Sequence, residues 1–222
     1  METFNIDIKE KKYFNNKVLQ DFTLNMPYGS IVGLLGLNGT GKTTLFDCIA
    51  GLEAYRGNMF GLSCGEFSYM CIRRNLFSDM SIKDAVNFYA DFYKDFDKKT
   101  ALKELAATRL NIKQSIRSLS AGQYRIVTFI LAINCDSKIY LFDEPLSNLD
   151  IIYKNFVIEK LISTISEEKI YIVASHELPD LENVFSHIAV IKEKECAPLI
   201  GVEEIREQGK SISDYYKGEV IC

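Results

Sequence analysis

The sequence predicts an α/β fold built on a mainly parallel sheet, and three observations favour that class. Residues 31–35 form a nearly all-apolar strand that runs into a glycine-rich turn and a short helix. From residue 120 onward, apolar strand patterns alternate with helical ones, as they do in sheets covered by helices. Residues 82–93 and 98–110 form two helical patterns in succession, which indicates an α-helical subdomain inserted into the chain.

The first third of the chain is rich in strand patterns. Apolar residues alternate over residues 3–8, and further strands are expected at 19–26 and 31–35. We expect the N-terminal β part to be antiparallel. A helix at 42–50 follows, and Gly51 stands where a glycine commonly ends a helix.

The last half of the chain predicts the elements that complete the sheet. They are a helix at 120–134, a strand at 138–142, a helix at 151–166, strands at 170–174 and 188–191, and one or two short helices after residue 202. We therefore expect a single domain over residues 1–222. Its core would comprise residues 1–72 and 115–222, with the helical subdomain at about 73–114.

Composition excludes several classes of protein. The 222 residues carry 26 basic and 30 acidic side chains, a net charge of −4, and 47% of them are hydrophobic, as in ordinary folded domains. No apolar stretch approaches the roughly 18 residues that span a bilayer, and the first residues lack a secretory signal, so a cytoplasmic location is predicted. Six scattered cysteines and two histidines disfavour a zinc site, and the acidic balance disfavours nucleic-acid binding.

Residues 36–43, with the sequence GLNGTGKT, fit the pattern G-x-x-x-x-G-K-[ST] between a strand and a helix. In such a P-loop, backbone N–H groups and the positive end of the helix surround phosphate oxygens. Lys42 can place its charge on the β- and γ-phosphates, and the Thr43 hydroxyl can bind Mg²⁺. We therefore expect a P-loop NTPase core. The candidate nucleotide-binding residues are Asn38, Gly39, Thr40, Gly41, Lys42, Thr43 and Thr44.

Two adjacent carboxylates, Asp143 and Glu144, follow the apolar strand at 138–142. Ligands of α/β sheets lie at the carboxyl ends of the strands, which places both residues opposite the P-loop. Asp143 is suited to holding Mg²⁺, directly or through water, and Glu144 to orienting or deprotonating the attacking water.

Residues 119–123, Leu-Ser-Ala-Gly-Gln, have two interpretations. Ser120 with Gln123 three residues later is a capping box that opens an apolar helix, as in many proteins. The segment is also similar to the L-S-G-G-Q signature of ATP-binding cassettes, which lies upstream of the Asp-Glu strand. With the P-loop, residues 147–150 as the D-loop and His176 at a strand end, the chain resembles the nucleotide-binding subunit of an ABC transporter.

This resemblance implies a head-to-tail dimer in which each ATP lies between the P-loop of one subunit and the signature of the other. The helix that begins at Ser120, where Gly122 removes side-chain bulk, is chemically suited to a second phosphate contact. The resemblance also assigns γ-phosphate contact to His176 and the D-loop role to Asp150. The signature residues in trans would be Ser120, Ala121, Gly122 and Gln123.

The resemblance further assigns the cofactors and partners: ATP with Mg²⁺, a transmembrane permease on a separate chain, and a position on the cytoplasmic face of the membrane. Tyr13 stands where the family places an aromatic ring against adenine, and the neighbouring Phe14 could serve instead. The helical insert and residues 71–77, including Leu76 and Phe77, would face the permease. Met80 would belong to the same surface, and the compact cassette favours an exporter.

One position departs from the family pattern. Ile72 occupies the place of a glutamine that normally reaches Mg²⁺ and the attacking water, and an isoleucine cannot coordinate a cation. Hydrolysis could therefore be slow, which leaves open a nucleotide-dependent regulatory module with weak hydrolysis. A soluble, non-transport cassette ATPase is the other alternative. His187 belongs to no motif and is expected at the surface or in the core.

Overall fold

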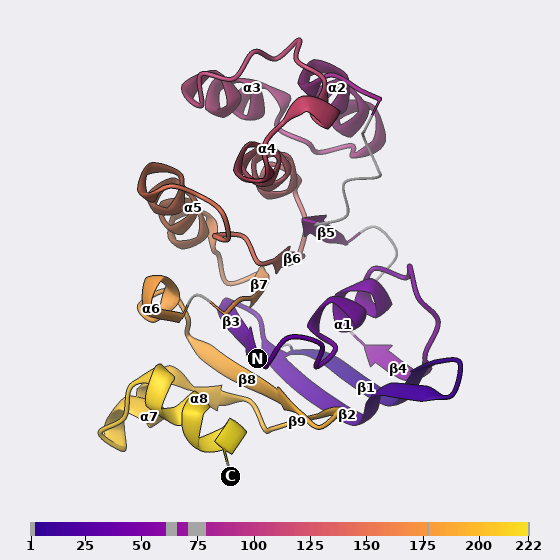
Figure 1. Cartoon of the computed structure of the whole chain (residues 1–222), viewed down its shortest axis with the longest axis vertical. Coiled ribbons are helices and arrows are strands. Elements are labelled where there is room, and N and C mark those ends of the chain that lie inside the picture. The colour runs from indigo at the N-terminus through magenta and orange to yellow at the C-terminus, as the bar shows by residue number, and fades with distance from the viewer. Residues whose placement is uncertain (1–2, 61–65, 71–78, 177, 222) are drawn as a thin grey trace.

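A computed structural model of the chain describes residues 3–60, 66–70, 79–176 and 178–221. It confirms the α/β class, with a mainly parallel sheet and a separate antiparallel sheet at the N-terminus. Figure 1 shows the helices α2 and α3 at one end of the molecule, the main sheet in the middle, and the antiparallel sheet with the C-terminal helices at the other end.

The N-terminal sheet has the order β2-β1-β4 and is antiparallel throughout. Its strands are β1 (Thr3–Tyr13), β2 (Asn16–Pro27) and β4 (Arg56–Phe60). Buried Phe4, Ile6 and Ile8 alternate with more exposed residues, as the sequence predicts. Both strands of the β1–β2 hairpin extend beyond their predicted ends, because polar residues there pair across the strands without an apolar alternation that could reveal them.

The main sheet has the order β10-β8-β3-β7-β6-β5, and β9 also pairs with β8. Five strands run parallel: β3 (Ser30–Leu35), β5 (Phe67–Met70), β6 (Ile139–Asp143), β7 (Ile170–Ala174) and β8 (His187–Lys192). The short strands β9 (Glu195–Cys196) and β10 (Ile200–Gly201) pair antiparallel with β8. Since β7 and β8 flank β3, the strand order reverses beside β3, and a ligand is expected at its carboxyl end.

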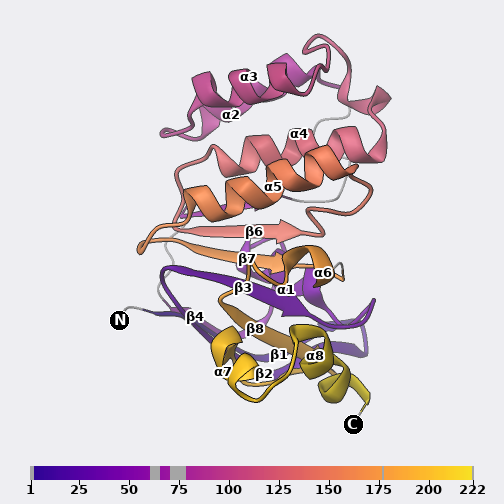
Figure 2. The same cartoon turned by 90° about the vertical axis from the view of Figure 1, so that its left-hand side faces the viewer.

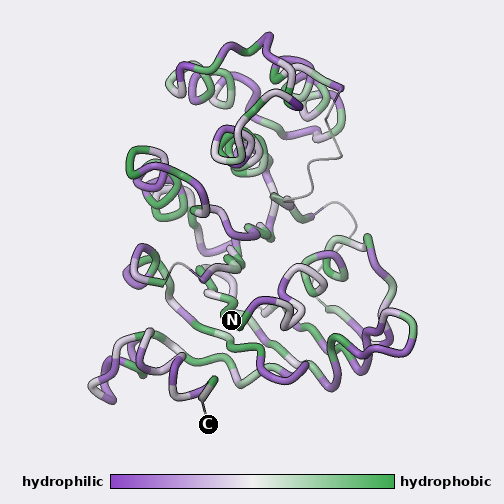
Figure 3. The backbone as a smooth tube through the Cα atoms, in the orientation of Figure 1, coloured by the Kyte–Doolittle hydropathy of each residue, from purple (hydrophilic) through white to green (hydrophobic). Residues whose placement is uncertain are grey.

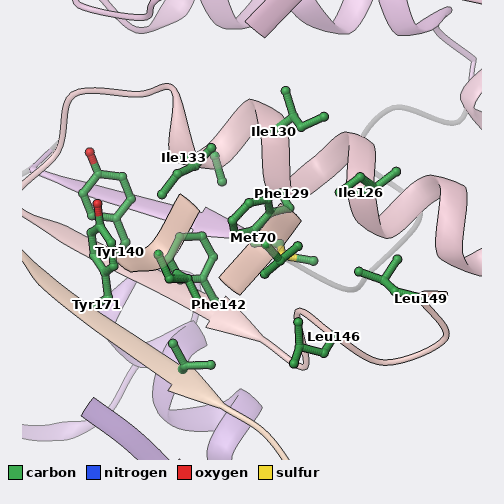
Figure 4. Packing of buried hydrophobic residues seen from close by; sticks show 14 of the residues in the cluster. Met70, Ile126, Phe129, Ile130, Ile133, Tyr140, Phe142, Leu146, Leu149 and Tyr171 are labelled. Atoms are coloured by element: carbon green, nitrogen blue, oxygen red, sulfur yellow. The ribbon is translucent and has the colours of Figure 1, made fainter. Parts of the chain in front are cut away.

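Side chains of the parallel strands alternate between two hydrophobic clusters, one on each face of the sheet. On β6, Tyr140 and Phe142 point to the cluster shown in Figure 4, whereas Ile139 and Leu141 point to the other. The helices α4 (Ala121–Ile133) and α5 (Ile151–Thr164) contribute to the first cluster. The second cluster is completed by α1 (Lys42–Ile49) and the antiparallel sheet. Because both faces of the sheet are buried, the sequences of the parallel strands are almost continuously apolar.

The remaining helices lie at the two ends of the molecule. The insert of α2 (Ile82–Phe92) and α3 (Lys98–Ala107) lies above α4 in Figure 2. The short helix η1 (Ile116–Ser118) leads from the insert to α4. The helices α6 (Leu178–Leu181), α7 (Val202–Glu207) and α8 (Ile212–Ile221) lie towards the other end. Hydrophobic and hydrophilic segments alternate around the turns of α3 and α5 in Figure 3, as expected of helices with one buried face.

Helix ends differ from the predicted ones by a few residues. The second helix of the insert ends three residues before the predicted Leu110, because Arg109 has a φ of 60° and cannot continue the helix. Gly51 follows α1 with a φ of 69°, as expected at a helix C-terminus. No helix among the described residues combines the length and the apolar character that crossing a bilayer requires.

Candidate functional site

The glycine-rich turn lies between β3 and α1, at the carboxyl edge of the sheet. Gly41 precedes the first residue of α1 with a φ of 108°, a region that side chains other than glycine rarely adopt. A Cβ atom at Gly41 would also lie 3.0 Å from Leu19 Cδ2 and 3.1 Å from Val18 Cγ1. The close packing of this turn against β2 therefore requires glycine.

A cavity of about 330 Å³ opens in front of this turn. It brings together six of the seven predicted P-loop residues and both predicted carboxylates. Its lining residues are Val18, Asn38, Gly39, Gly41, Lys42, Thr43, Thr44, Asp143 and Glu144. Thr40 does not line this cavity, and its hydroxyl donates a hydrogen bond to the Leu37 carbonyl at 2.9 Å. The sequence analysis did not identify Val18, which reaches the cavity through its packing against Gly41.

Lys42 supplies the positive charge of the cavity. Its Nζ donates hydrogen bonds to the carbonyl oxygens of Gly36 at 2.7 Å and Leu37 at 3.0 Å, and the side chain is buried. Burial lowers the pKa of Lys42, while the negative charges of Glu144 and Asp143 act in the opposite direction. The glycine-rich turn therefore surrounds the Lys42 ammonium, and Lys42 lines the cavity in which a phosphate would bind.

Asp143 and Thr43 form the second feature of the cavity. The Thr43 hydroxyl donates a hydrogen bond of 2.7 Å to Asp143 Oδ2, and Asp143 is only 2% exposed. Burial raises the pKa of Asp143 to about 6, although the Thr43 hydrogen bond lowers it and the charge of Glu144 raises it further. A hydroxyl and a carboxylate side by side are hard oxygen donors, the type that Mg²⁺ prefers.

Glu144 lies at the end of β6 with a φ of 51°, in the left-handed region. Its N–H donates to the Ala174 carbonyl at 2.8 Å, and its Oε2 lies 2.8 Å from His176 Nδ1. The His176 N–H also points to Oε2 at 3.4 Å. Arg125 on α4 donates from Nη1 to the Glu144 carbonyl at 2.8 Å. The sequence analysis missed Arg125, for which the available signal was one cation inside an apolar helix.

The signature residues lie elsewhere, since none of them lines the described cavity. Ser120 and Gln123 form the predicted capping box at the start of α4: the Gln123 N–H donates to Ser120 Oγ at 3.2 Å and the Ser120 N–H to Gln123 Oε1 at 3.0 Å. Ser120 and Ala121 are exposed. A Cβ atom at Gly122 would lie 2.4 Å from the Asn148 carbonyl oxygen, so the start of α4 packs tightly on residues 147–150.

Three further predicted residues lie outside the cavity. Asp150 caps α5, where its Oδ1 accepts hydrogen bonds from the N–H groups of Ile152 and Tyr153, both at 3.0 Å. Tyr13 ends β1, with the Lys11 ammonium 4.4 Å from its ring centroid. Phe14 is 99% exposed in the hairpin turn. Neither ring lines the described cavity.

Several expectations concern other parts of the chain. Ile72, Leu76 and Phe77 lie outside the described residues. Met80 is partly buried and packs against the hydrophobic cluster of α4. His187 is half-buried at the start of β8, where its Nδ1 lies 2.9 Å from Ser186 Oγ.

A second cavity of about 430 Å³ separates α2 from the sheet; we call it the α2 groove. Its lining comes from α1, β5, α2 and α4 and comprises Ala50, Leu52, Phe67, Tyr69, Phe88, Tyr89, Phe92, Tyr93, Tyr124 and Thr128, none of them charged. Leu52 is 59% exposed and Phe92 is 72% exposed. The Phe88 and Phe92 rings stack at 5.6 Å on the surface of α2.

Comparison with known proteins places this geometry in a family. The family model described as ABC transporter matches residues 19–147, more than half of the chain. An uncharacterised ABC transporter ATP-binding protein of Methanocaldococcus jannaschii is 28% identical over 95% of this chain and 82% of its own length. The nickel import system ATP-binding protein NikE of Staphylococcus aureus is 27% identical, with coverage of 90% and 92%.

Solved structures agree on the fold. The structure of an ATP-binding subunit of an ABC transporter superposes with a TM-score of 0.84 at 20% identity, covering 97% of this chain and 98% of that one. A nucleotide-free ATP-binding cassette from an ABC transporter gives a TM-score of 0.75 at 16% identity, with coverage of 97% and 98%.

Proposed function

This chain belongs to the ABC transporter ATP-binding family, whose cassettes are ATPases, and we propose that it hydrolyses ATP to drive a separate membrane permease. The observation that carries the proposal is one cavity lined by a buried lysine, a hydroxyl–carboxylate pair and a glutamate. Lys42 supplies a cation, and Asp143 and Glu144 supply two carboxylates that suit a metal ligand and a general base, the roles that phosphoryl transfer to water requires.

Nucleotide binding is assigned to the P-loop. The triphosphate takes the place of the Gly36 and Leu37 carbonyls as the partner of Lys42, and the start of α1 adds N–H groups. The nucleotide's base lies beyond Val18, which faces the cavity, and Tyr13 remains our proposed stacking residue.

Magnesium fits the donor set of Thr43 and Asp143, a hydroxyl and a buried carboxylate that already lie 2.7 Å apart. Held there, Mg²⁺ would supply positive charge to the phosphate oxygens. It would also compensate the negative charge of Asp143, whose pKa burial raises to about 6 in the metal-free chain.

Glu144 acts on the attacking water, and His176 acts beside it. The carboxylate is largely buried and hydrogen-bonds His176, so its direction is fixed before substrate arrives. General-base catalysis of this kind contributes about 10²–10⁴-fold to rates. The His176 side chain is 57% exposed, so its ring can turn towards the γ-phosphate of a bound nucleotide.

A second copy of the chain completes the site. Ser120 and Gly122 open α4 at the surface, outside the cavity of their own chain, and the N-terminus of a helix favours a phosphate. In the proposed dimer, this end of α4 covers the γ-phosphate in the other copy's cavity. ATP then favours the closed dimer through contacts that exist only there.

The permease docks in the α2 groove, on the cytoplasmic face of the membrane. The groove is uncharged and holds the exposed rings of Phe88 and Phe92, which suits an apolar helix carried on a cytoplasmic loop of the permease. The helix α2, which lines one side of the groove, belongs to the helical insert that is expected to face the permease. An exporter remains our prediction for the direction of transport.

The groove is tested with Phe92→Ser against a matched control, Ile162→Ser, which removes an exposed side chain from α5. We expect Phe92→Ser to weaken capture of the permease from detergent-solubilised native membranes by about tenfold or more, as for interface hot spots. The ATPase rate of the isolated chain should not change. Equal capture by both variants would contradict docking in the α2 groove.

The overall function is tested by steady-state ATP hydrolysis of the purified chain, alone and with native membranes. We expect Mg²⁺-dependent turnover that rises when the permease is present. Background turnover in both samples would instead favour a nucleotide-dependent regulatory module. Robust turnover without capture of any membrane protein would favour a non-transport cassette.

A further inference from the structure

Arg125 is a buried cation on the helix that begins with the signature residues. It is 9% exposed and lies in the second turn of α4, between Tyr124 and Ile126, which are both buried. Its Nη1 donates hydrogen bonds to two backbone carbonyls, those of Glu144 and Ser147, at 2.8 Å each. A charged group is costly to bury, so a role in fixing these two carbonyls accounts for its position.

The first of these carbonyls belongs to a residue in an unfavourable conformation. Glu144 has a φ of 51°, which is strained for a side chain other than glycine and persists only where neighbours hold it. All three polar groups of Glu144 are held here. Its N–H donates to the Ala174 carbonyl, and its carboxylate lies against His176. Its carbonyl accepts from Arg125 Nη1 at 2.8 Å and from the Ser147 N–H at 3.3 Å.

Among these partners, Arg125 comes from outside the β6–β7 edge and the turn that follows β6. Ala174 ends β7, His176 follows it and Ser147 lies three residues after Glu144, whereas Arg125 lies on α4. The charge of Arg125 also lowers the pKa of the neighbouring Asp143, against the effect of burial. The guanidinium therefore acts on both carboxylate residues of the cavity.

We propose that Arg125 is the positioning residue that holds Glu144 in its left-handed conformation and so aims its carboxylate at His176 and the attacking water. The proposal rests on the proposed function of Glu144 as the base. It also gives α4 a second role, because the helix whose first turn would face the ATP of the other copy fixes the base of its own cavity.

The test compares Arg125→Gln with wild type in steady-state kinetics. A displaced base should lower kcat by about 100-fold, as misplacements of about 1 Å can, while KM stays within about threefold. Ile130→Ala is the matched control, since it truncates a fully buried side chain of α4 that is apolar and cannot donate a hydrogen bond to the Glu144 carbonyl. It should destabilise the protein while leaving kcat near wild type.

A second readout needs no hydrolysis. The chain has two histidines, so the His176 ring signals in an NMR spectrum can be assigned with His187→Gln. In nucleotide-free Arg125→Gln, these signals should move to those of a Glu144→Ala reference, in which the ring has lost its carboxylate partner. The control Ile130→Ala should keep the wild-type signals.

Arg125→Lys carries the same test if the glutamine variant does not fold. A single ammonium lacks the planar fork of arginine, so we expect about a tenfold loss of kcat and an intermediate shift of the His176 signals. Wild-type signals in Arg125→Gln or, failing that, in Arg125→Lys would overturn the proposal. A wild-type protein that hydrolyses no ATP would instead contradict the proposed function, and the NMR comparison would still decide the role of Arg125.

Discussion

The P-loop cavity and the start of α4 differ in how far each is complete within one chain. In the cavity, Lys42 and Asp143 are buried and already hydrogen-bonded to residues of the same loop or sheet edge. At the start of α4, Ser120 and Ala121 are exposed. The described hydrogen bonds of Ser120 stay within the helix, as the capping box with Gln123 and the bond from the Tyr124 N–H to the Ser120 carbonyl. Each region is proposed to contact a phosphate. The P-loop region forms a cavity within one chain, whereas the start of α4 lies outside that cavity.

Because of this difference, we expect nucleotide binding and dimerisation to depend on different residues. A cavity with its cation and carboxylates in place can bind nucleotide in a single chain, whereas an exposed helix start contributes only when another surface approaches it. Substitutions in the two regions should therefore have different effects. Changes in the cavity should alter chemistry or affinity, and changes at the start of α4 should alter assembly, and turnover through it, without altering the ATP affinity of a single chain.

The largest effect is expected in the chemical step. Glu144→Gln keeps the size of the side chain but removes the base, so kcat should fall by about 10³-fold with the ATP dissociation constant nearly unchanged. Phosphate release in steady state and equilibrium titration measure the two quantities. Glu204→Gln, on α7 and away from the P-loop cavity, is the control. A variant with more than a tenth of the wild-type rate would remove Glu144 from the role of base.

The next effect concerns affinity. Lys42→Ala should raise the dissociation constant for ATP by about 100-fold or more, because losing a buried charged partner costs at least 2–3 kcal/mol. Isothermal titration calorimetry measures it. Lys217→Ala on α8 serves as the control for loss of one positive charge. An unchanged affinity in Lys42→Ala would contradict the assignment of the cavity.

A smaller effect concerns stability and pH. In the nucleotide-free folded chain the pKa of Asp143 is about 6, whereas its ordinary value, expected in the unfolded chain, is 3.8. The folded chain therefore binds this proton more tightly than the unfolded chain, and protonation of Asp143 stabilises the fold. That stability is complete below pH 4 and is lost as the pH rises through 6, in total about 2–3 kcal/mol. Between pH 4.5 and 7.5, the free energy of unfolding of Asp143→Asn should therefore rise relative to wild type.

Urea unfolding at the two pH values, without Mg²⁺ or nucleotide, measures this difference. The control is Asp91→Asn, which changes an exposed carboxylate of α2 and should follow wild type. Parallel pH dependences of Asp143→Asn and wild type would show that Asp143 does not titrate in this range.

Much of the cavity could be predicted because its residues occur in short contiguous segments. Two such segments are the turn from Gly36 to Thr43 and the pair Asp143–Glu144. Each directly follows an apolar strand, so a short sequence pattern is enough to identify it. The capping box at Ser120 is equally local, and the structure forms it.

Other features depend on contacts between distant segments. Val18 lines the cavity only because β2 packs on Gly41, and Arg125 finds its carbonyl partners 19 and 22 residues further along the chain. The α2 groove draws residues from four elements, so no single pattern contains it. The extended ends of β1 and β2 are held by pairing between polar residues, which carry no periodic signal.

The central claim is that one ATP lies between the P-loop of one copy and the start of α4 of another. Light scattering of Glu144→Gln, with and without Ala121→Asp at the exposed start of α4, tests it most directly at saturating MgATP. We expect Glu144→Gln to double in mass, and the double variant to bind ATP with similar affinity yet remain a monomer. A Glu144→Gln chain that stays monomeric with ATP bound, or a double variant that dimerises equally well, would contradict the claim.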